Sequence, residues 1–376
     1  MRTVGHYDLI VRAARVIDAA EERDGPADIA VQGDRIVRVG DLKEDTADRV
    51  LDAPGLVASA GWIDLHVHCV RAALAASVDP DRDAGVETGV TTVVDTGSVG
   101  TEELSALREV AESATTRVLG YLNVSARRGP ITHGDWSQFD QKLTIEAAEA
   151  NRDLLLGIKV LASQRHCGNL GIIPLQLGVQ AAREARTGLM VHIGVAPPTI
   201  QDVLTMLGPG DIVTHCFKAY PGGIMSRAGR PVPEAWAAVD RGVRFDIGHG
   251  QGSFCFFAAR QALAAAFPFH SISTDLHTGN VRGPVFTLAR TMAKFLHLGV
   301  GLPDVVRLAT LGPATAMGRV QEFGTLRPGA CADITVFRVK EGPVAYTDSQ
   351  GYTEQGNVDL EPVYTVRAGK VVKGPR

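Results

Sequence analysis

His66 and His68, in the segment Gly61-Trp62-Ile63-Asp64-Leu65-His66-Val67-His68, are the residues whose type and spacing point most directly to chemistry. Side chains at positions i and i+2 of a β-strand point to the same face, so two imidazoles spaced in this way can hold one metal ion. The apolar stretch over residues 56–63 is typical of a buried strand entering a core. Two ordinary core or surface histidines would give the same pattern, so the metal interpretation depends on residues further along the chain.

Four more polar residues close apolar segments downstream. These are Lys159, His192, His215 and Asp275, each at the end of a short run of aliphatic residues. Burying such a side chain without a partner costs free energy, and a shared metal cluster would supply the partner.

The segments that carry these residues alternate with amphipathic helices at intervals of about thirty residues. This α/β pattern predicts a (β/α)8 TIM barrel, in which functional residues occupy the carboxyl ends of the strands. A doubly wound open sheet is the alternative, but no glycine-rich phosphate loop follows any of the segments. We expect strands at 62–68, 90–96, 117–124, 154–161, 188–193, 211–216, 243–247 and 270–275, and helices at 101–113, 144–155, 174–186, 233–240 and 261–266.

Both ends of the chain contain short strands separated by turns. We expect them to pair into one small β-sandwich domain, with residues 1–57 as its N-terminal part and residues 319–376 as its C-terminal part. The barrel would then occupy residues 58–318.

Composition narrows the class of protein. The chain has 376 residues, of which 45% are hydrophobic and 21% charged, as in a globular protein with a large interior. A net charge of −4 without a run of Lys or Arg argues against nucleic acid or an anionic membrane as a partner. No apolar run of about 18 residues and no signal-peptide pattern occurs, which favours the cytoplasm. The five cysteines are odd in number and scattered, so we expect them to be reduced.

The ordered set of His-x-His, Lys, His, His and Asp resembles the amidohydrolase superfamily of metal-dependent hydrolases, over nearly the whole chain. The resemblance implies two divalent metal ions. His66, His68 and Asp275 would hold one ion, His192 and His215 the second, and Lys159 would bridge both as a carbamate. Within the superfamily, residues 79–81, 89–95, 248–254 and 273–277 look most like a dihydroorotase-related group of deacetylases. Members of that group are often labelled dihydroorotases, although it includes enzymes that act on acetylated 2-hydroxy acids.

Lys159 requires a physical explanation, because a protonated ammonium would repel two divalent cations. A carbamate, formed from the neutral amine and carbon dioxide, is an anionic oxygen ligand, and burial beside cations favours the neutral amine. A plain structural lysine paired with Asp95 is the alternative. The ligand set suits zinc, and iron, manganese or nickel would also be compatible with it.

The predicted charge layout suggests a mechanism. Two ions would activate a shared water and polarise the substrate carbonyl. Asp275 would take the proton of that water and deliver it to the leaving group, which matters most for an amide.

Other residues are candidates for substrate binding. His249 and His277 follow the seventh and eighth predicted strands, and Lys218, Arg165 and Arg282 are the cations on predicted loops that could hold a substrate carboxylate. The loop 217–230, which contains Lys218, would either close over an anionic substrate or be a solvated loop. We expect ordinary structural roles for the histidines at positions 6, 133, 166, 270 and 297.

One departure from the family pattern bears on the reaction. Dihydroorotases resembling this chain carry an arginine two residues beyond the His-x-His pair, where this chain has Val70, and Arg71 would face the other way. We therefore favour a deacylase, which cleaves an acetylated 2-hydroxy acid or an N-acyl amino acid, over a cyclic amidohydrolase of the dihydroorotase or hydantoinase type. A non-catalytic scaffold would be expected to have lost ligands, and none is missing. Homo-oligomers are a family-level expectation.

Overall fold

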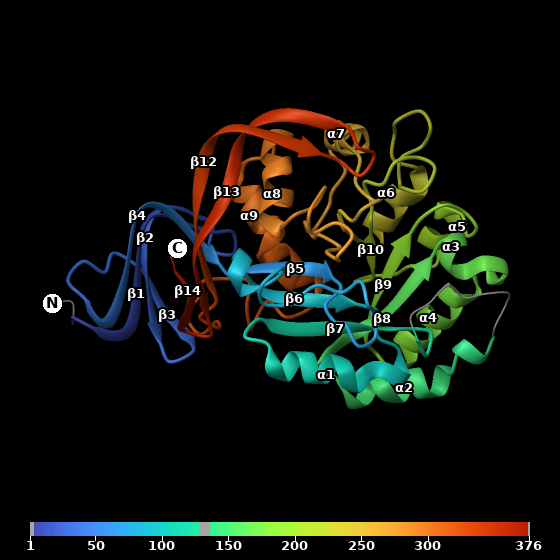
Figure 1. Ribbon diagram of the computed structural model, residues 1–376, viewed down its shortest axis with the longest axis horizontal. Helices are drawn as coiled ribbons and strands as arrows, with labels where there is room; N and C mark the ends of the chain where they lie inside the picture. The colour runs from blue at the N-terminus through green and yellow to red at the C-terminus, as the bar shows by residue number, and fades with distance from the viewer. Residues whose placement is uncertain (1–3, 128–135, 375–376) are drawn as a thin grey trace.

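A parallel sheet of seven strands forms the centre of the molecule. The computed structural model, which describes residues 4–127 and 136–374, places these strands in the order β11-β10-β9-β8-β7-β6-β5 (Figure 1). Neighbouring strands are consecutive in the chain, and helices connect most of them, as the alternating pattern predicts. The strands are β5 (Trp62–Val67), β6 (Val90–Thr96), β7 (Arg117–Asn123), β8 (Leu155–Ala162), β9 (Gly188–Ile193), β10 (Ile212–Thr214) and β11 (Arg244–Asp246).

The expected eighth strand, residues 270–275, has no regular strand geometry. It makes isolated parallel bridges instead, from Ser271 to Asp246 of β11 and from Leu276 to Val67 of β5. The Asp275 N–H donates to the carbonyl of His66 over 2.6 Å, at a residue whose φ of 50° lies outside the strand region. The segment therefore links both edges of the curled sheet and completes the barrel, although the left-handed turn at Asp275 interrupts its ladder.

The helices pack around this sheet. Those flanking the barrel strands are α1 (Leu104–Ser113), α2 (Gln141–Ala150), α3 (Gln164–Cys167), α4 (Ile173–Glu184), α5 (Ile200–Thr205), α6 (Pro233–Asp240), α7 (Phe256–Ala264), α8 (Leu288–His297), α9 (Leu302–Ala309) and α10 (Leu311–Ala316).

Two helices differ by several residues from the extent expected from the sequence. The helix expected at 144–155 is α2, which begins earlier because the Asp140 side chain accepts the N–H of Leu143 as an N-cap. It ends at Ala150, and a turn at residues 151–154 leads into β8, which begins at the buried Leu155. The helix expected at 261–266 is the second half of α7, which begins at Phe256.

Both ends of the chain contribute to a second sheet of mixed direction, in the order β14-β13-β12-β4-β1-β2-β3. Alternate residues such as Leu9 and Val11 enter its shared core, together with Ile334 and Val336 from the other end of the chain. The strands are β1 (His6–Asp18), β2 (Arg23–Gln32), β3 (Arg35–Gly40), β4 (Thr46–Ala60), β12 (Ile334–Thr347), β13 (Thr353–Arg367) and β14 (Lys370–Lys373).

The hairpin of β12 and β13 extends well beyond the rest of this sheet: β12 pairs with β4 only at residues 334–337, but it pairs with β13 as far as Thr347. Figure 1 shows it arching away from the terminal sheet, over α8, toward α7. It carries Leu360 and Tyr346 into the barrel's core cluster. This hairpin thus connects the terminal sheet to the barrel.

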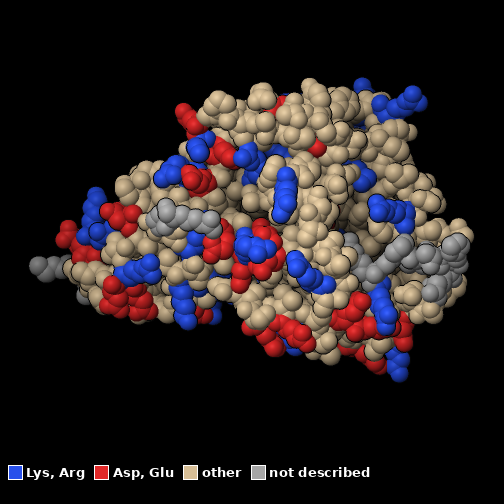
Figure 2. Space-filling view, in the orientation of Figure 1, with Lys and Arg blue, Asp and Glu red and all other residues tan. Residues whose placement is uncertain are grey.

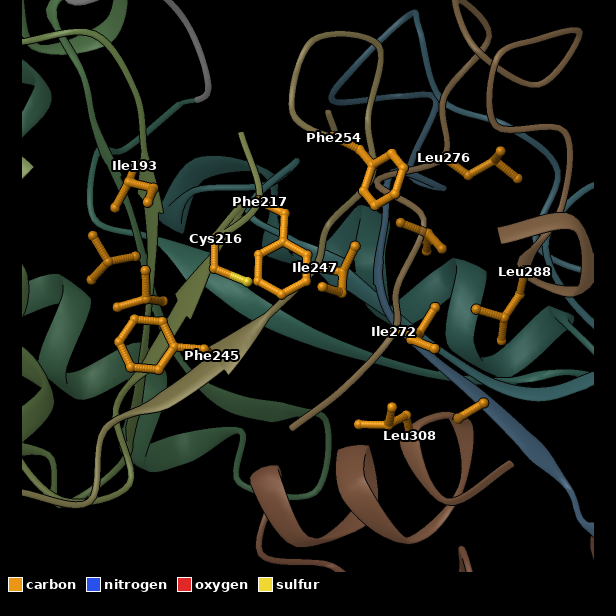
Figure 3. Close-up of a cluster of buried hydrophobic side chains, with 14 of the residues drawn as sticks. Ile193, Cys216, Phe217, Phe245, Ile247, Phe254, Ile272, Leu276, Leu288 and Leu308 are labelled. Atoms are coloured by element: carbon orange, nitrogen blue, oxygen red, sulfur yellow. The ribbon is translucent and has the colours of Figure 1, made fainter. Parts of the chain in front are cut away.

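The largest core cluster lies between the barrel strands and the helices. Figure 3 shows part of it, where Phe217, Ile247 and Phe254 lie near Ile272. On the face drawn in Figure 2, positive and negative side chains are interspersed. Among the described residues, no helix combines the length and apolar character needed to cross a bilayer.

Candidate metal centre

His66 and His68 lie at the end of β5, and Asp275 meets them from the closing segment. The Oδ1 atom of Asp275 is 3.4 Å from Nε2 of His66 and 3.1 Å from Nε2 of His68. One potential ligand atom from each of the three residues lies within 4.8 Å of the other two. Both histidines are buried, and the Asp275 side chain is 16% exposed. This is the arrangement expected of three ligands to one ion.

Hydrogen bonds at the opposite ring nitrogens orient two of the histidines. The hydroxyl of Thr214 donates to Asp246 over 2.7 Å and therefore accepts from Nδ1–H of His66, at 2.9 Å. Nδ1–H of His215 donates to the carbonyl of Gly248 over 2.7 Å, because a carbonyl can only accept. Each ring therefore presents the unprotonated Nε2 to the site, which is the nitrogen that a metal requires.

His192 and His215 form the second half of the site. Their ring centroids are 4.5 Å apart, and His215 is 5.1 Å from the ring of His66. His215 follows β10 with a φ of 76°, so two of the predicted ligands, this residue and Asp275, have left-handed backbones. Such conformations cost free energy in non-glycine residues and concentrate at functional sites.

Lys159 lies between these groups, fully buried on β8. Its Nζ atom is 3.5 Å from Nε2 of His66 and 3.3 Å from the sulfur of Met190. Gly97 makes room for the side chain: a Cβ at Gly97 would lie 2.7 Å from Cγ of Lys159. Asp95, the alternative partner for the lysine, accepts the N–H groups of Ser98 and Cys69, each over 2.9 Å.

A cavity of about 180 Å³ is lined by the candidate ligands. Its apolar wall consists of Leu74, Ala76 and Leu161. Its polar lining consists of Thr96, His66, His68, His166, His192, His215, Asp275 and His277.

The protonation states suit cation binding. Burial lowers the pKa of His66 and His192 well below its usual range and that of His215 to about 3, so the three rings are neutral. Burial alone would raise the pKa of Asp275, but the neighbouring His66 and the hydrogen bond from His68 bring it well below the usual value. His66, His192 and His215 are therefore neutral imidazoles beside an anionic carboxylate.

Two buried carboxylates beneath the site were missed in the sequence analysis. Asp64 accepts the hydroxyl of Thr274 over 2.6 Å and the N–H of His66 over 3.2 Å, and burial raises its pKa to about 7. Asp246 accepts three hydroxyls, including that of Thr214. The available signal was a charged residue inside an apolar strand, two residues before His66 for Asp64 and between Phe245 and Ile247 for Asp246.

Of the five predicted substrate-binding residues, His277 is the one that lines the cavity within the described chain. His277 lines the cavity, whereas His249 is fully buried outside its lining, stacked on Phe254 with its Nε2 atom 2.6 Å from Nζ of Lys294. Lys218 donates to the carbonyl of Gly252 over 2.9 Å.

Arg165 and Arg282 are exposed and are not among the cavity-lining residues of the described chain. His166, for which we expected an ordinary role, lines the cavity beside His192, with ring centroids 5.1 Å apart. A position directly after the lysine-bearing strand was the signal that could have identified it.

The other histidines lie elsewhere. His6 pairs with Asp48, His297 pairs with Glu354, and His270 accepts the N–H of Phe245. His133 lies outside the described residues.

The position of the arginine found in similar dihydroorotases is apolar here. Val70 is fully buried, and Arg71 is exposed, with a long hydrogen bond of 3.4 Å to the carbonyl of Ser77. Neither residue lines the cavity. A substrate carboxylate in this cavity would therefore need another partner.

The sequence and the fold of this chain are similar to those of known proteins. Residues 294–373 match the model described as "Amidohydrolase family". A deacetylase of Enterococcus faecalis is 35% identical over 97% of this chain and 99% of its own, and a deacetylase of Agrobacterium fabrum is 35% identical over 93% and 87%. Among solved structures, one titled as an adenine deaminase has a TM-score of 0.88 at 35% identity and covers 98% of this chain and 100% of its own. One titled as a dihydroorotase has a TM-score of 0.86 at 33% identity and covers 98% of each chain.

Proposed function

The chain belongs to the amidohydrolase family and is a metal-dependent hydrolase, and we propose that it removes the acyl group, as a deacetylase, from a small carboxylate-bearing substrate. Acetylated 2-hydroxy acids and N-acyl amino acids are the two substrate classes. The observation that carries the proposal is the convergence of His66, His68 and Asp275 within 4.8 Å at the base of the cavity. The full-length likeness to named deacetylases supports the choice of acyl group.

The residues present fit a pair of divalent ions. His66, His68 and Asp275 would hold the first, and His192 and His215 the second, with zinc as the ion that this donor set suits best. Among the described residues, the buried Thr96 hydroxyl in the cavity wall has no hydrogen-bond partner, as expected beside a site that holds a further group. When bound, the ions would supply an activated water and polarise the substrate carbonyl.

Lys159 as a carbamate is part of the proposal. The support is its complete burial among neutral imidazoles and its 3.5 Å separation from Nε2 of His66. An ammonium at this position would repel cations, whereas a carbamate would contribute anionic oxygens between both halves of the site.

Asp275 would move the proton. Its carboxylate is anionic and its Oδ1 atom faces His66 and His68 at the site, so it is placed to accept a proton from water. Its backbone is held by the N–H bond to His66 and by the Asn280 side chain, whose amide donates to the Asp275 carbonyl over 2.8 Å. The carboxylate thus stays in place while it takes a proton and passes it to the leaving alcohol or amine.

The cavity limits the substrate. A volume of about 180 Å³, with Leu74, Ala76 and Leu161 in the lining, suits an acetyl or similarly small acyl group. Lys218 lies three residues after His215 and supplies positive charge near the site; burial is the main cause of the lowered pKa of His192 and of His215, and the charge of Lys218 adds to it. With His166 and His277 in the lining, these residues are the candidates for the substrate's carboxylate and leaving group.

A cyclic amidohydrolase is the second candidate, and the likeness to a structure titled as a dihydroorotase favours it. The apolar Val70 argues against it, because the arginine expected of a dihydroorotase at that position is missing.

A substrate panel tests the proposal. The purified protein, with its metal content measured, is incubated with an acetylated 2-hydroxy acid, an N-acetyl amino acid, dihydroorotate and adenine. We expect acetate release from one of the first two and no turnover of the others. Turnover of dihydroorotate alone would reverse the order of the two candidates, and a protein retaining only trace metal would contradict both.

A further inference from the structure

We propose that the tip of the β12–β13 hairpin is a positioning element of the active site, in which Ser349 fixes the loop of residues 248–254 against Asp275. Only the activity readout of this proposal rests on the proposed function. The hairpin comes from the terminal sheet, so the proposal makes that sheet part of the catalytic apparatus (Figure 1).

Ser349 contacts the loop at several points. Its hydroxyl accepts the N–H of Phe254 over 3.0 Å and lies 3.0 Å from the Gly250 carbonyl and 3.2 Å from the His249 carbonyl, to which it can donate. Its own N–H donates to the Phe254 carbonyl over 2.9 Å. One side chain thus joins both ends of the loop.

The loop in turn backs directly onto Asp275. Gly250 has a φ of 54°, and a Cβ on it would lie 2.5 Å from Oδ2 of Asp275. The Gly250 N–H donates to the carbonyl of Thr274, the residue before Asp275, over 2.8 Å. A shift of Gly250 therefore changes the space available to the carboxylate.

Lys294 on α8 joins the same two segments from behind. Its Nζ atom donates to the carbonyl of Thr347 at the end of β12 over 2.7 Å and to that of Pro284 over 2.9 Å. It also lies 2.6 Å from Nε2 of His249, whose Nδ1 is 2.9 Å from the Gly250 carbonyl. Lys294 is completely buried, so water does not compete for these bonds.

The hairpin is itself held in place. Glu354, just beyond the tip, pairs with Arg260 of α7 and with His297 of α8, the latter over 2.7 Å. Further back, Asp359 pairs with Arg290 of α8 at 2.9 Å. The tip therefore rests on a fixed arm, which is what a positioning contact requires.

The test compares Ser349→Ala with Thr353→Val. The control also removes a hydroxyl from the hairpin tip, but the exposed Thr353 bonds within the hairpin, to the Thr347 hydroxyl over 2.9 Å, rather than to the loop. Hydrogen exchange followed by mass spectrometry is read at peptides covering residues 248–256. We expect faster exchange there in Ser349→Ala, unchanged exchange in Thr353→Val, and a melting temperature within a few degrees of the wild type in both.

Activity gives a second readout that general destabilisation would not mimic. An N-acetyl amino acid needs a proton on its leaving amine, whereas p-nitrophenyl acetate releases a phenolate that does not. A displaced Asp275 should lower kcat for the amide on the order of tenfold or more, with a smaller loss for the activated ester and little change in KM. A second variant, Ser349→Thr, retains a hydroxyl and should recover part of the loss.

The outcomes separate the two proposals. Unchanged exchange at residues 248–256 in Ser349→Ala overturns the positioning role, as do equal losses on both substrates. A wild-type protein that hydrolyses neither substrate contradicts the proposed deacylation, while the exchange experiment still decides whether Ser349 holds the loop.

Discussion

The hydroxyl of Thr214 accepts a hydrogen bond from Nδ1 of His66 over 2.9 Å and donates one to Asp246, so a residue outside the predicted ligand set fixes the tautomer of a predicted ligand. We predict that Thr214→Val weakens the binding of added zinc at the proposed His66 site roughly 10- to 100-fold, as is typical for such outer partners. Titration of the metal-free protein against a competing chelator measures this. Thr310→Val is the control, because that buried hydroxyl donates only to a helix carbonyl, of Val306. Equal affinities in both variants would contradict the role of Thr214.

Gly97 tests whether Lys159 needs its present position. In Gly97→Ala the new Cβ would lie 2.7 Å from Cγ of Lys159, so the lysine must move. We expect the variant to bind fewer than two ions per chain and to lose most of its activity. Gly210→Ala is the matched control, because Gly210 has a similar φ of 84° but a Cβ there would meet no atom within 4 Å. The two variants share the backbone strain, so a similar loss of metal in both would remove the link to Lys159.

The proximity of the candidate ligands could be predicted from sequence, because most of them are polar residues at the end of an apolar strand, and the barrel brings such ends together. His192 and His215 follow this rule, whereas Lys159 lies within β8, with three residues of the strand after it. Asp275 departs from this rule, because its segment pairs with the sheet through isolated bridges and not as a regular strand. Its left-handed backbone lies where this segment closes the barrel.

The parts that the sequence did not predict depend on contacts between distant segments. His249 stands in a glycine-rich turn, which suggested a substrate contact, yet its ring is buried against Lys294, 45 residues away. The contact of Ser349, at the tip of the β12–β13 hairpin, with residues 248–254 is likewise accompanied by ion pairs from the hairpin to α7 and α8, and strand periodicity carries no information about them. Local pattern thus predicts which residues face the site, and tertiary contacts determine which residues support them.

Asp275→Asn removes the proton acceptor and keeps the shape of the side chain. We expect kcat to fall by about 10²- to 10⁴-fold, because an amide cannot take the proton from water or deliver it to the leaving group. Much of the bound metal should remain, since His66 and His68 are unchanged. Steady-state kinetics with metal analysis measures both quantities, and Asp304→Asn, at an exposed carboxylate, is the control. Near-normal turnover in Asp275→Asn would contradict the assigned role.

The proposed carbamate predicts that recovery of activity depends on carbon dioxide. After the metal is removed by a chelator at low pH, zinc alone in carbon dioxide-free buffer should restore activity slowly and incompletely. Zinc with bicarbonate should restore it fully, because the amine must be carboxylated before it can bridge the ions. Lys159→Met should show no response to bicarbonate. Full recovery of the wild type without any carbon dioxide would show that Lys159 acts as an unmodified amine.

Lys294 predicts a dependence of stability on pH. Burial lowers the pKa of Lys294 to about 7; the charge of Asp348 partly offsets this shift, and that of Arg290 adds to it. In the unfolded chain the pKa of a lysine is about 10.4. Between these two values unfolding takes up a proton, so the free energy of unfolding rises with pH, by up to about 1.4 kcal/mol per pH unit. Lys294→Met lacks this pH-dependent contribution. The variant also leaves three acceptors without their partner, including Nε2 of His249, which changes its free energy of unfolding by an amount that does not follow the titration of the lysine. Denaturant unfolding of both proteins at pH 7 to 10 should therefore give curves that diverge in favour of the wild type as pH rises. Curves that stay parallel over this range would show that Lys294 keeps its proton in the folded protein.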